Sequence, residues 1–323
     1  MKDVRAAARD CAAMKSLLLL CLFSTVAFAQ SPKAKAKTAK GNRAAPAMTD
    51  APVKHENHVY KTTPQGELKL HFALPVDWKA SDKRPAIVFF FGGGWTSGSY
   101  LQFVAQSDYF ASRGMVAASA DYRIKSIHGT TPDKCVEDAK SAVRYLRQHA
   151  AELGIDPSKV VAAGGSAGGH IAACTALIEA FDAETDDKSI SAKPNAMVLF
   201  NPALNIDELA IERKAGAEDQ KQAEAITPNR FIKAGVPPAI MFFGTNDALK
   251  AGADGYLAKA KPLGLRAELW TAEGEAHGFF NRGPWSLITT KKADGFLASL
   301  GYLNGPPTVK LPEGAPSLKQ DVK

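Results

Sequence analysis

The sequence lacks an uninterrupted apolar run of the roughly 20 residues that a membrane-spanning helix needs. Its apolar segments are short and broken by polar residues, which excludes a polytopic membrane protein. It also lacks an internal repeat. The chain has 323 residues, 46% of them hydrophobic, and is therefore long enough to bury one large core. We expect one globular domain.

The N-terminus has the features of a secretory signal peptide. Basic residues precede an apolar run that ends at Ala27-Phe28-Ala29, the small-x-small form that signal peptidase cleaves. We predict a signal peptide over residues 1–29, starting at Met1 or Met14, and a secreted or periplasmic protein. We expect no stable membrane insertion after cleavage. An uncleaved membrane anchor is the alternative.

Cysteine is scarce, with four in the whole chain. Cleavage after residue 29 would remove Cys11 and Cys21 and leave Cys135 and Cys174. An export compartment permits a disulfide, but both remaining cysteines fall on predicted helices and nothing in the sequence shows that they meet. We interpret them as buried thiols.

Positive charge is concentrated near the N-terminus. The formal net charge is +7; residues 1–29 hold four basic and two acidic groups and residues 31–54 hold six and one, which leaves the remainder neutral. A neutral domain does not indicate a nucleic-acid partner. Residues 30–57 are rich in Lys, Ala and Pro and predict a basic, flexible linker. Contact of this segment with an anionic envelope is the alternative.

From residue 58 onward, strand and helix patterns alternate. Polar and apolar residues alternate over Leu68 to Leu74, which predicts a half-buried strand in an antiparallel edge hairpin. Later apolar runs are continuous and separated by helical segments, which predicts an α/β fold with a mostly parallel sheet and helices on both faces. The expected strands are 87–91, 115–120, 159–163, 196–200, 239–243 and 266–271, and the first helices are 102–113, 131–153 and 167–180.

We predict one domain over residues 58–303, with a small polar insertion over Ala203–Ile226 that is rich in Glu, Lys, Asp and Gln. Residues 304–323 are dominated by Gly, Pro and Lys. We predict that this tail is disordered.

The segment Gly164-Gly165-Ser166-Ala167-Gly168 lies between a predicted strand and a predicted helix. A Gly-x-Ser-x-Gly pattern in that context is typical of a nucleophile elbow, in which a strained turn exposes the serine hydroxyl above the sheet. A Gly-rich helix N-terminus that binds a phosphate is the alternative. We predict that Ser166 is a catalytic nucleophile.

A serine hydroxyl needs an imidazole to accept its proton and a carboxylate to orient that imidazole. After a nucleophile elbow, the acid and the histidine follow the serine along the chain. Only His170 and His277 follow Ser166, and His170 lies one turn along the same helix, where we expect it to pack or cap. His277 is therefore the predicted base. Asp247, in a loop after a predicted strand, is the predicted acid, with Asp254 as the alternative.

Three glycines, 92 to 94, directly follow a predicted buried strand. Without Cβ atoms such a segment is able to turn its N–H groups toward the oxygen that becomes negative in acyl transfer. Gly93, Gly94 and the N–H of Ala167 are the predicted oxyanion hole. A turn needed only for shape is the alternative, and a phosphate loop is excluded because no Gly-Lys-Ser/Thr follows. The predicted chemistry requires no metal and no organic cofactor.

Five motifs occur in combination: Gly92-Gly93-Gly94-Trp95, Ser119-Ala120-Asp121-Tyr122-Arg123, Gly164-Gly165-Ser166-Ala167-Gly168, Asn246-Asp247 and His277-Gly278-Phe279. Together they resemble the α/β-hydrolases related to hormone-sensitive lipase and to the acetyl xylan and feruloyl esterases, over about residues 66–302. The resemblance implies the α/β-hydrolase fold, a catalytic domain over residues 58–303 and the triad Ser166, Asp247 and His277.

This sequence departs from the resemblance at two positions. Phe91 stands where a histidine usually precedes the glycines, and Gly165 stands where the lipase-like group has an aspartate. Both departures favour the polysaccharide esterases. The three triad roles depend on neither position.

Aromatic residues near the predicted site suggest a substrate class. Trp95, Tyr100 and Phe279 lie in or beside predicted site loops, and aromatic faces stack on sugar rings or aromatic acyl groups. The polar insertion differs from the apolar lid expected of a lipase. With the predicted export, these features favour acetyl or feruloyl esters of plant polysaccharide. A broad short-chain carboxylesterase or lipase-like enzyme and, in another class, a non-catalytic hydrolase-fold binding protein are the alternatives.

Overall fold

A nine-stranded sheet runs through the part of the chain that the structure, a computed structural model, describes: residues 48–212 and 214–322. The strand order is β1-β2-β4-β3-β5-β6-β7-β8-β9. The strands are β1 (Val53–Thr63), β2 (Gly66–Pro75), β3 (Arg84–Phe90), β4 (Val116–Ala120), β5 (Ile155–Gly165), β6 (Ala196–Phe200), β7 (Ala239–Gly244), β8 (Ala267–Ala272) and β9 (Lys319–Asp321). The predicted signal peptide and residues 30–47 of the predicted linker lie outside the described residues.

Strands β3 to β8 pair in parallel. The core strands are apolar along their length because both faces of the sheet are covered, and Ala86 to Phe90 have no exposed surface. The edges are antiparallel, with β1 on β2, β2 on β4 and β9 on β8. The mostly parallel sheet and the hairpin at its first edge agree with the sequence prediction.

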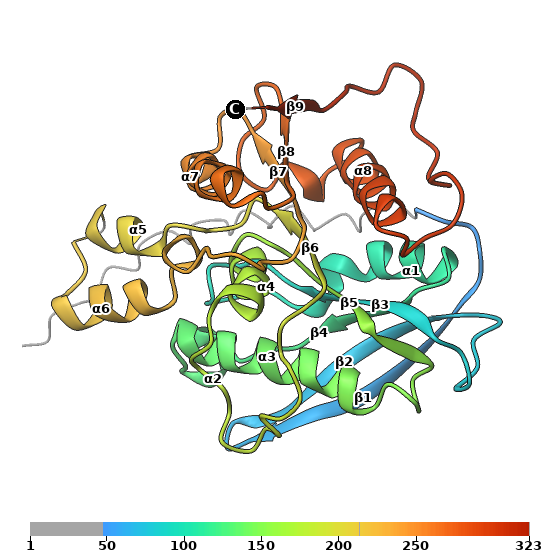
Figure 1. Ribbon diagram of the computed structural model, residues 1–323, viewed down its shortest axis with the longest axis horizontal. Coiled ribbons are helices and arrows are strands. Elements are labelled where there is room, and N and C mark those ends of the chain that lie inside the picture. Colours follow the sequence, from blue (N-terminus) through green and yellow to red (C-terminus); the bar gives the residue numbers. More distant parts are fainter. Residues whose placement is uncertain (1–47, 213, 323) are drawn as a thin grey trace, which may run out of the picture. The chain divides into compact units, whose positions relative to one another are not determined.

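Helices cover both faces of the sheet (Figure 1). Helices α1 (Val104–Ser112) and α8 (Trp285–Ser299) contribute to the core on one face, and α3 (Pro132–Gln148), α4 (Ala167–Leu177) and α7 (Lys250–Ala260) to the core on the other. Shorter elements are α2 (Lys125–His128), η1 (Tyr100–Phe103), η2 (Pro228–Arg230), η3 (Lys261–Leu263) and η4 (Phe279–Asn281). Among the described residues, no helix combines the length and apolarity needed to cross a membrane.

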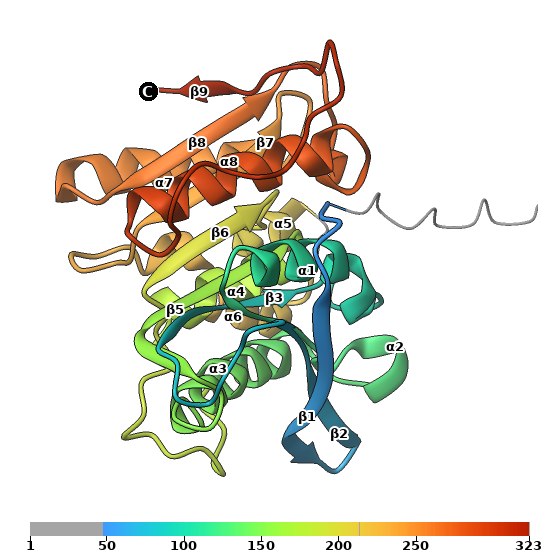
Figure 2. The same ribbon diagram turned by 90° about the vertical axis from the view of Figure 1, so that its right-hand side faces the viewer.

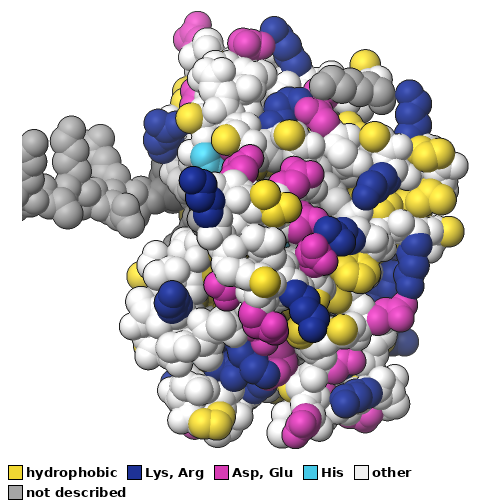
Figure 3. Space-filling view, turned by 90° about the vertical axis from the view of Figure 1, so that its left-hand side faces the viewer, with side chains coloured by type: hydrophobic (Ala, Val, Ile, Leu, Met, Phe, Trp, Pro, Cys, Tyr) yellow, Lys and Arg dark blue, Asp and Glu magenta, His cyan; other side chains and the backbone are white. Residues whose placement is uncertain are grey.

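The predicted insertion over Ala203–Ile226, here called the cap, contains two short helices, α5 (Ile206–Glu212) and α6 (Ala217–Ala225). Helix α6 buries Ala223 and leaves its charged residues exposed. Figure 3 shows the side on which α5 and α6 lie in Figure 1, and there acidic and basic side chains are interspersed with small hydrophobic areas. The cap is therefore polar on this face, as its composition predicts.

Two predicted boundaries are wrong. The predicted linker 30–57 extends too far, because β1 starts at Val53 and pairs with β2 through its backbone. Charged side chains at the start of β1 face solvent, which is why composition suggested a linker there. The predicted disorder of residues 304–323 is also wrong, because β9 pairs with β8 through Asp321↔Leu269 to Lys319↔Thr271. Figure 2 shows β9 beside β8 at one edge of the sheet and the β1–β2 hairpin at the opposite edge.

Residues 304–322, here called the C-terminal arm, are held by side chains of α1 and its C-cap. Arg113 donates hydrogen bonds to the first two carbonyl oxygens of the arm (2.9 and 3.1 Å). The Tyr109 hydroxyl accepts from the N–H groups of Thr308 (3.1 Å) and Val309 (3.4 Å), and Val309 is buried. Composition does not reveal this order, because the anchors lie about 200 residues earlier in the chain.

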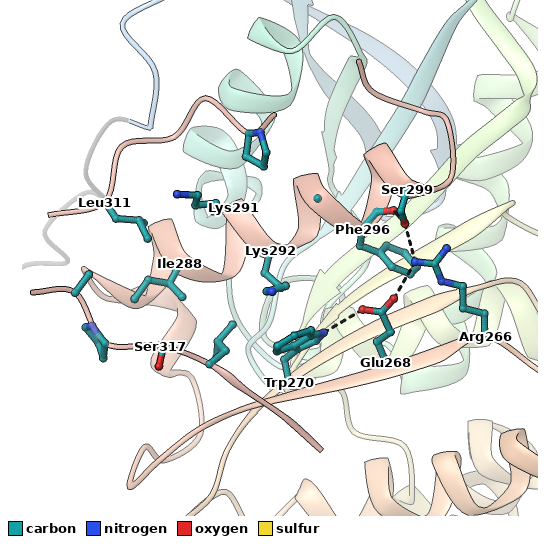
Figure 4. Close-up of a pocket in the computed structure, with 15 residues that line it drawn as sticks. Arg266, Glu268, Trp270, Ile288, Lys291, Lys292, Phe296, Ser299, Leu311 and Ser317 are labelled. Carbon is teal, nitrogen blue, oxygen red and sulfur yellow. Dashed lines mark hydrogen bonds and ion pairs between the residues drawn. The ribbon is translucent and has the colours of Figure 1, made fainter. Parts of the chain in front are cut away.

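The arm also covers a cavity of about 680 Å³ between β8 and α8 (Figure 4). Inside it, Lys292 Nζ lies 3.6 Å from the centre of the Trp270 ring. Glu268 accepts hydrogen bonds from Trp270 (3.1 Å) and Arg266 (2.9 Å). The lining contains none of the predicted site residues.

Candidate active site

Ser166 occupies a strained turn between β5 and α4. Its φ of 54° and ψ of −118° lie in a region that residues with side chains rarely adopt. Gly168 lets the start of α4 approach β3 closely, because a Cβ at that position would lie 2.0 Å from the carbonyl oxygen of Phe90 at the end of β3. The Ser166 N–H donates to the carbonyl of Phe200 (2.8 Å). The strand, turn and helix are those of a nucleophile elbow.

The side chains of Ser166, His277 and Asp247 form one hydrogen-bonded chain. His277 Nε2 lies 2.8 Å from Ser166 Oγ, and His277 Nδ1 lies 2.9 Å from Asp247 Oδ2. An ionised carboxylate only accepts hydrogen bonds, so Nδ1 carries the proton and Nε2 is left to accept from the serine hydroxyl. With this tautomer, the imidazole is oriented to take the proton of Ser166.

Asp247 is buried, and its charge is compensated by hydrogen bonds. Its side chain is 1% exposed. Oδ2 accepts from His277 and from Asn201 Nδ2–H (2.6 Å), and Oδ1 accepts from the N–H of Leu249 (2.9 Å). These three donors replace the water that burial removes from the carboxylate.

Asn201 is a site residue that sequence reasoning missed. It follows β6 directly, has no exposed surface and has a φ of 47°, which Asn tolerates better than most residues. Besides donating to Asp247, its side chain accepts from the N–H of Gly278 (3.3 Å). Asn201 therefore joins the acid to the loop that carries His277. Its position after a strand was the available signal, but no motif marks it.

Residues 92–95, here called the glycine loop, lie directly against the elbow. A Cβ at Gly92 would lie 2.9 Å from the carbonyl oxygen of Gly165 and 3.2 Å from Ser166 Cβ. Only glycine fits at such a close approach. The backbone of the glycine loop is thus in contact with the serine.

The N–H groups predicted to form the oxyanion hole have no partner among the described residues. Gly93 (φ 133°) and Gly94 (φ 62°) are exposed and adopt positive φ. Over residues 48–212 and 214–322, no protein acceptor takes the N–H of Gly93, Gly94 or Ala167. These donors are therefore available to a substrate oxygen.

Trp95 ends the glycine loop and is anchored by His170. Its indole N–H donates to His170 Nδ1 (3.0 Å), and His170 Nε2–H donates to the carbonyl of Ile226 at the end of the cap (2.7 Å). Both ring nitrogens thus have fixed roles, which requires a neutral imidazole. Burial lowers the pKa of His170 to about 4, against the opposing effect of the Ile226 carbonyl. His170 connects the cap to the glycine loop, and substrate contact by Trp95 stays a prediction.

The prediction that Phe279 contacts substrate is wrong, because the structure buries this side chain. Gly278, with a φ of 79°, immediately precedes η4, whose first residue, Phe279, lies in the core. Phe279 has no exposed surface and packs edge-on against Trp285. Tyr100 is half-buried and stacks on His71, with 3.4 Å between ring centroids. Its contact with substrate stays a prediction.

At both positions where the sequence departs from the resemblance, Gly165 and Phe91, aromatic rings pack around the site. A Cβ at Gly165 would lie 2.4 Å from Cζ of Phe280, so the ring occupies the space that a larger residue would need. Phe91 stacks on Tyr122, with 4.1 Å between ring centroids, and the Tyr122 hydroxyl donates to the Phe91 carbonyl (2.6 Å). Aromatic side chains therefore replace polar ones around the elbow.

The alternative acid and the two cysteines lie elsewhere in the fold. Asp254 lies on α7 and pairs with Lys250 Nζ (2.9 Å). Cys135 and Cys174 are buried free thiols. The side chain in hydrogen-bond contact with His277 Nδ1 is that of Asp247.

A family model, BD-FAE, matches residues 72–254, which is more than half of the chain. The chain belongs to the BD-FAE family. The match begins in β2 and ends in α7, so it includes the glycine loop, the elbow and Asp247. Together with the relatives below, it places this family member in the esterase group of the α/β-hydrolases, as the motifs predict.

Curated relatives of this BD-FAE member include esterases. The chain is 28% identical over 250 residues to a probable isoprenylcysteine alpha-carbonyl methylesterase, ICMEL1, of Arabidopsis thaliana, which covers 70% of this chain and 51% of the relative. It is 26% identical over 227 residues to carboxylesterase NlhH of Mycobacterium tuberculosis, covering 62% and 68%. The chain thus spans about half the length of the plant relatives that it matches.

Solved structures show the same fold. Esterase 2 of Thermogutta terrifontis phosphorylated by paraoxon is 47% identical, with a TM-score of 0.72, and the match covers 78% of this chain and 96% of that one. The same esterase with propionate bound is 46% identical, with a TM-score of 0.73 and coverage of 80% and 98%. A butyrate-bound structure also matches, at 45% identity. The sheet described above is that of an α/β-hydrolase.

Proposed function

We propose that the protein hydrolyses carboxylic esters, with Ser166 as nucleophile, His277 as base and then acid, and Asp247 as the residue that orients His277. The observation that carries the proposal is the hydrogen-bonded chain from Asp247 through His277 to Ser166 Oγ (2.9 and 2.8 Å) at a nucleophile elbow. Membership in an esterase group supports it. A non-catalytic binding protein would not need this chain of hydrogen bonds.

In the first half of the reaction, Ser166 Oγ attacks the ester carbonyl carbon while His277 Nε2 takes the hydroxyl proton. The carbonyl oxygen becomes negative and accepts hydrogen bonds from the N–H groups of Gly93, Gly94 and Ala167, each worth about 3 to 4 kcal/mol of transition-state stabilisation. The C–O bond to the alcohol then breaks. The alcohol oxygen takes the proton from His277, which leaves an acyl group on Ser166.

In the second half, water replaces the alcohol. His277 Nε2 takes a proton from water, and the resulting oxygen nucleophile attacks the acyl carbon. The bond to Ser166 Oγ breaks, and Oγ takes the proton back from His277. The carboxylic acid leaves, and the serine hydroxyl and neutral imidazole are restored.

We propose short acyl groups as the preferred acids, with acetyl esters of plant polysaccharide as the natural substrate. The esterase 2 structures with propionate and butyrate support a short acyl group. The His277 side chain is 40% exposed, so the site is open to solvent and has room for a bulky alcohol such as a polymer chain. Feruloyl esters have less support, because Phe279 is buried.

The same neighbours favour a second candidate, a broad short-chain carboxylesterase without preference for polysaccharide. Export through the signal peptide predicted over residues 1–29 would favour an extracellular polymer. Export is also a proposal. Fractionating cells that express the full chain, with N-terminal sequencing of the mature protein, tests cleavage after Ala29.

The substrate test compares kcat/KM for p-nitrophenyl acetate, butyrate and octanoate, acetate release from acetylated xylan and ferulate release from a feruloyl sugar. We expect hydrolysis that falls with acyl length, together with release of acetate from the polymer. Fast hydrolysis of small acetates without polymer activity would assign the broad carboxylesterase. If folded protein cleaves no ester, the proposed activity is wrong.

The nucleophile is tested by labelling. Paraoxon transfers a diethylphosphoryl group to an activated serine with release of p-nitrophenolate, and mass spectrometry should locate one such group on the peptide that contains Ser166. Ser166→Ala should abolish labelling and lower kcat by about 10⁶-fold, the size seen when a triad serine is removed. Ser158→Ala, at the opposite end of β5, is the matched control and should keep full activity.

A further inference from the structure

Gln102 links the glycine loop to the loop that carries His277. It lies in η1, ten residues after Gly92, and its Oε1 accepts from the N–H of Gly92 (2.6 Å). Its Nε2–H donates to Oδ1 of Asn281 in η4 (2.9 Å), 179 residues away in sequence. Asn281 Nδ2–H in turn donates to the carbonyl of Gly278, the neighbour of His277 (3.1 Å). We call these contacts the amide bridge.

The polarity of the amide bridge is fixed at both ends. The N–H of Gly92 only donates, so Gln102 must present its oxygen there and its nitrogen to Asn281. The carbonyl of Gly278 only accepts, so Asn281 must present its nitrogen to Gly278 and its oxygen to Gln102. Both requirements are met at once by the same two side-chain orientations. The amides of Gln102 and Asn281 therefore have one orientation each in which all three hydrogen bonds form.

The amide bridge ends at two sensitive positions. Gly92 is the residue whose backbone touches the elbow, with a Cβ position 3.2 Å from Ser166 Cβ, and it precedes the N–H donors of Gly93 and Gly94. Gly278 follows His277, whose Nε2 must stay 2.8 Å from Ser166 Oγ. The bridge thus spans from the oxyanion donors to the base, on the two loops that surround the serine. A shift of about 1 Å in such a group costs on the order of 100-fold in rate.

We infer that Gln102 is a positioning residue, whose amide, through Asn281, holds the oxyanion donors and His277 at a fixed separation around Ser166. This inference rests on the proposed ester hydrolysis. It does not assign Gln102 a contact with substrate. Gln102 acts through two backbone segments that are far apart in the sequence.

The test measures kcat and KM for p-nitrophenyl acetate with Gln102→Ala, Asn281→Ala and the double variant, with each kcat divided by the number of sites that paraoxon titrates. We expect each single variant to lower kcat per titrated site by about 10- to 100-fold with KM changed less than about threefold, because the bridge acts on transition-state geometry. The double variant should lose no more than the more impaired single variant, because both side chains belong to one bridge.

Gln222→Ala is the matched control, because Gln222 also joins two elements through its side-chain amide, from the cap to Asp133 (2.8 Å). It should leave kcat unchanged. Gln102→Glu is a second variant of the same size, for use if Gln102→Ala does not fold. It keeps the acceptor for Gly92 but loses the donor to Asn281, so it should lose at least 10-fold in kcat per titrated site.

Three outcomes would overturn the inference: full kcat per titrated site in the Gln102 variants, additive losses in the double variant, or a raised KM with unchanged kcat. The last would indicate direct substrate contact. A wild-type protein that neither hydrolyses esters nor reacts with paraoxon would instead contradict the proposed function. The two failures are therefore distinguishable.

Discussion

Asn201 donates a 2.6 Å hydrogen bond to the same oxygen of Asp247 that accepts from His277 Nδ1–H at 2.9 Å. Because the two donors share this oxygen, Asn201 and His277 together set the orientation of the acid. Asn201 also accepts from the N–H of Gly278. A single buried amide therefore holds both the acid and the loop of the base.

Asn201→Gly should lower kcat by about 10-fold with little change in KM. Glycine adopts the φ of 47° found here, so the variant removes the side-chain hydrogen bonds without backbone strain. A hydrogen bond to a charged group is worth about 1.5 to 3 kcal/mol. The measurement is kcat per paraoxon-titrated site. Asn201→Asp has the same shape but places a second carboxylate beside Asp247, so its kcat should be lower than that of Asn201→Gly. Equal kcat of the wild type and the two variants would refute the role of Asn201.

Asp247→Asn should lower kcat by about 10⁴-fold, as in a serine protease triad, because the amide favours the wrong tautomer of His277. Asp254→Asn is the matched control on α7 and should keep near-full activity. The comparison uses kcat for p-nitrophenyl acetate. Loss of activity in Asp254→Asn alongside full activity in Asp247→Asn would reverse the assignment of the acid.

The centre of the sheet was predictable because strands buried on both faces are continuous apolar runs. The predicted strand 196–200 coincides with β6, and 239–243 lies one residue short of β7. Strand β9 was not predictable, because its three polar residues pair with β8 through the backbone. Hydrophobic pattern identifies strands by what their side chains bury, and the side chains of β9 bury little.

The candidate site follows the same division. Ser166, Asp247 and His277 each come after a strand and lie in recognisable motifs, and the structure brings them together; their catalytic roles stay predictions. Gln102 and Asn281 have no local pattern, because their partnership depends on two loops meeting in space. Phe279 was misplaced because its sequence position beside His277 does not reveal that η4 turns into the core.

His170 should make folding stability depend on pH in the acid range. Its pKa is about 4 in the folded protein and about 6.5 in the unfolded chain, so the unfolded chain binds more protons between these values. The stability from the neutral imidazole is therefore complete above pH 6.5 and is lost as pH falls toward 4. The loss between pH 7 and pH 4.5 should be about 2.5 kcal/mol.

His170→Gln tests this dependence, because an amide offers an acceptor and a donor but does not titrate in this range. Urea unfolding at pH 7 and pH 4.5 gives the free energy of unfolding of both proteins. All other titrating groups contribute equally, so the variant should lose about 2.5 kcal/mol less than the wild type over this interval. Equal pH dependence would show that His170 does not titrate as its burial indicates.

Gly165→Ala should destabilise the fold by about 1 to 3 kcal/mol, the usual cost of overpacking, because the new Cβ would lie 2.4 Å from Phe280 Cζ. The penalty should shrink in a Phe280→Leu background, because the closest contact of the new Cβ is then removed. Urea unfolding of the four proteins of this cycle measures the coupling. Gly295→Ala, in α8 with nothing near its Cβ position, is the control and should be stabilising by up to about 1 kcal/mol. Additive penalties would show that Phe280 does not restrict residue 165.

Removing the C-terminal arm after Leu303 should destabilise the domain, whereas loss of a disordered tail would have no effect. The arm buries Val309, and burying one Val side chain is worth about 1.5 to 3 kcal/mol. It also supplies β9 and the backbone N–H donors that bind the Tyr109 hydroxyl. We expect a loss of at least about 2 kcal/mol in the free energy of unfolding.

Tyr109→Phe shows whether that loss comes from the arm's anchors. In the full chain this variant should cost about 1 to 2 kcal/mol, because it leaves Thr308 and Val309 N–H without their acceptor and removes the hydroxyl that binds Asp294 (2.6 Å). In the truncated chain only the Asp294 contact remains to be lost, so the same substitution should cost less. Unchanged kcat of the truncated chain, measured under conditions below its unfolding range, would show that its sheet is intact. Equal losses of unfolding free energy from Tyr109→Phe in both chains would then show that the arm is not anchored at Tyr109.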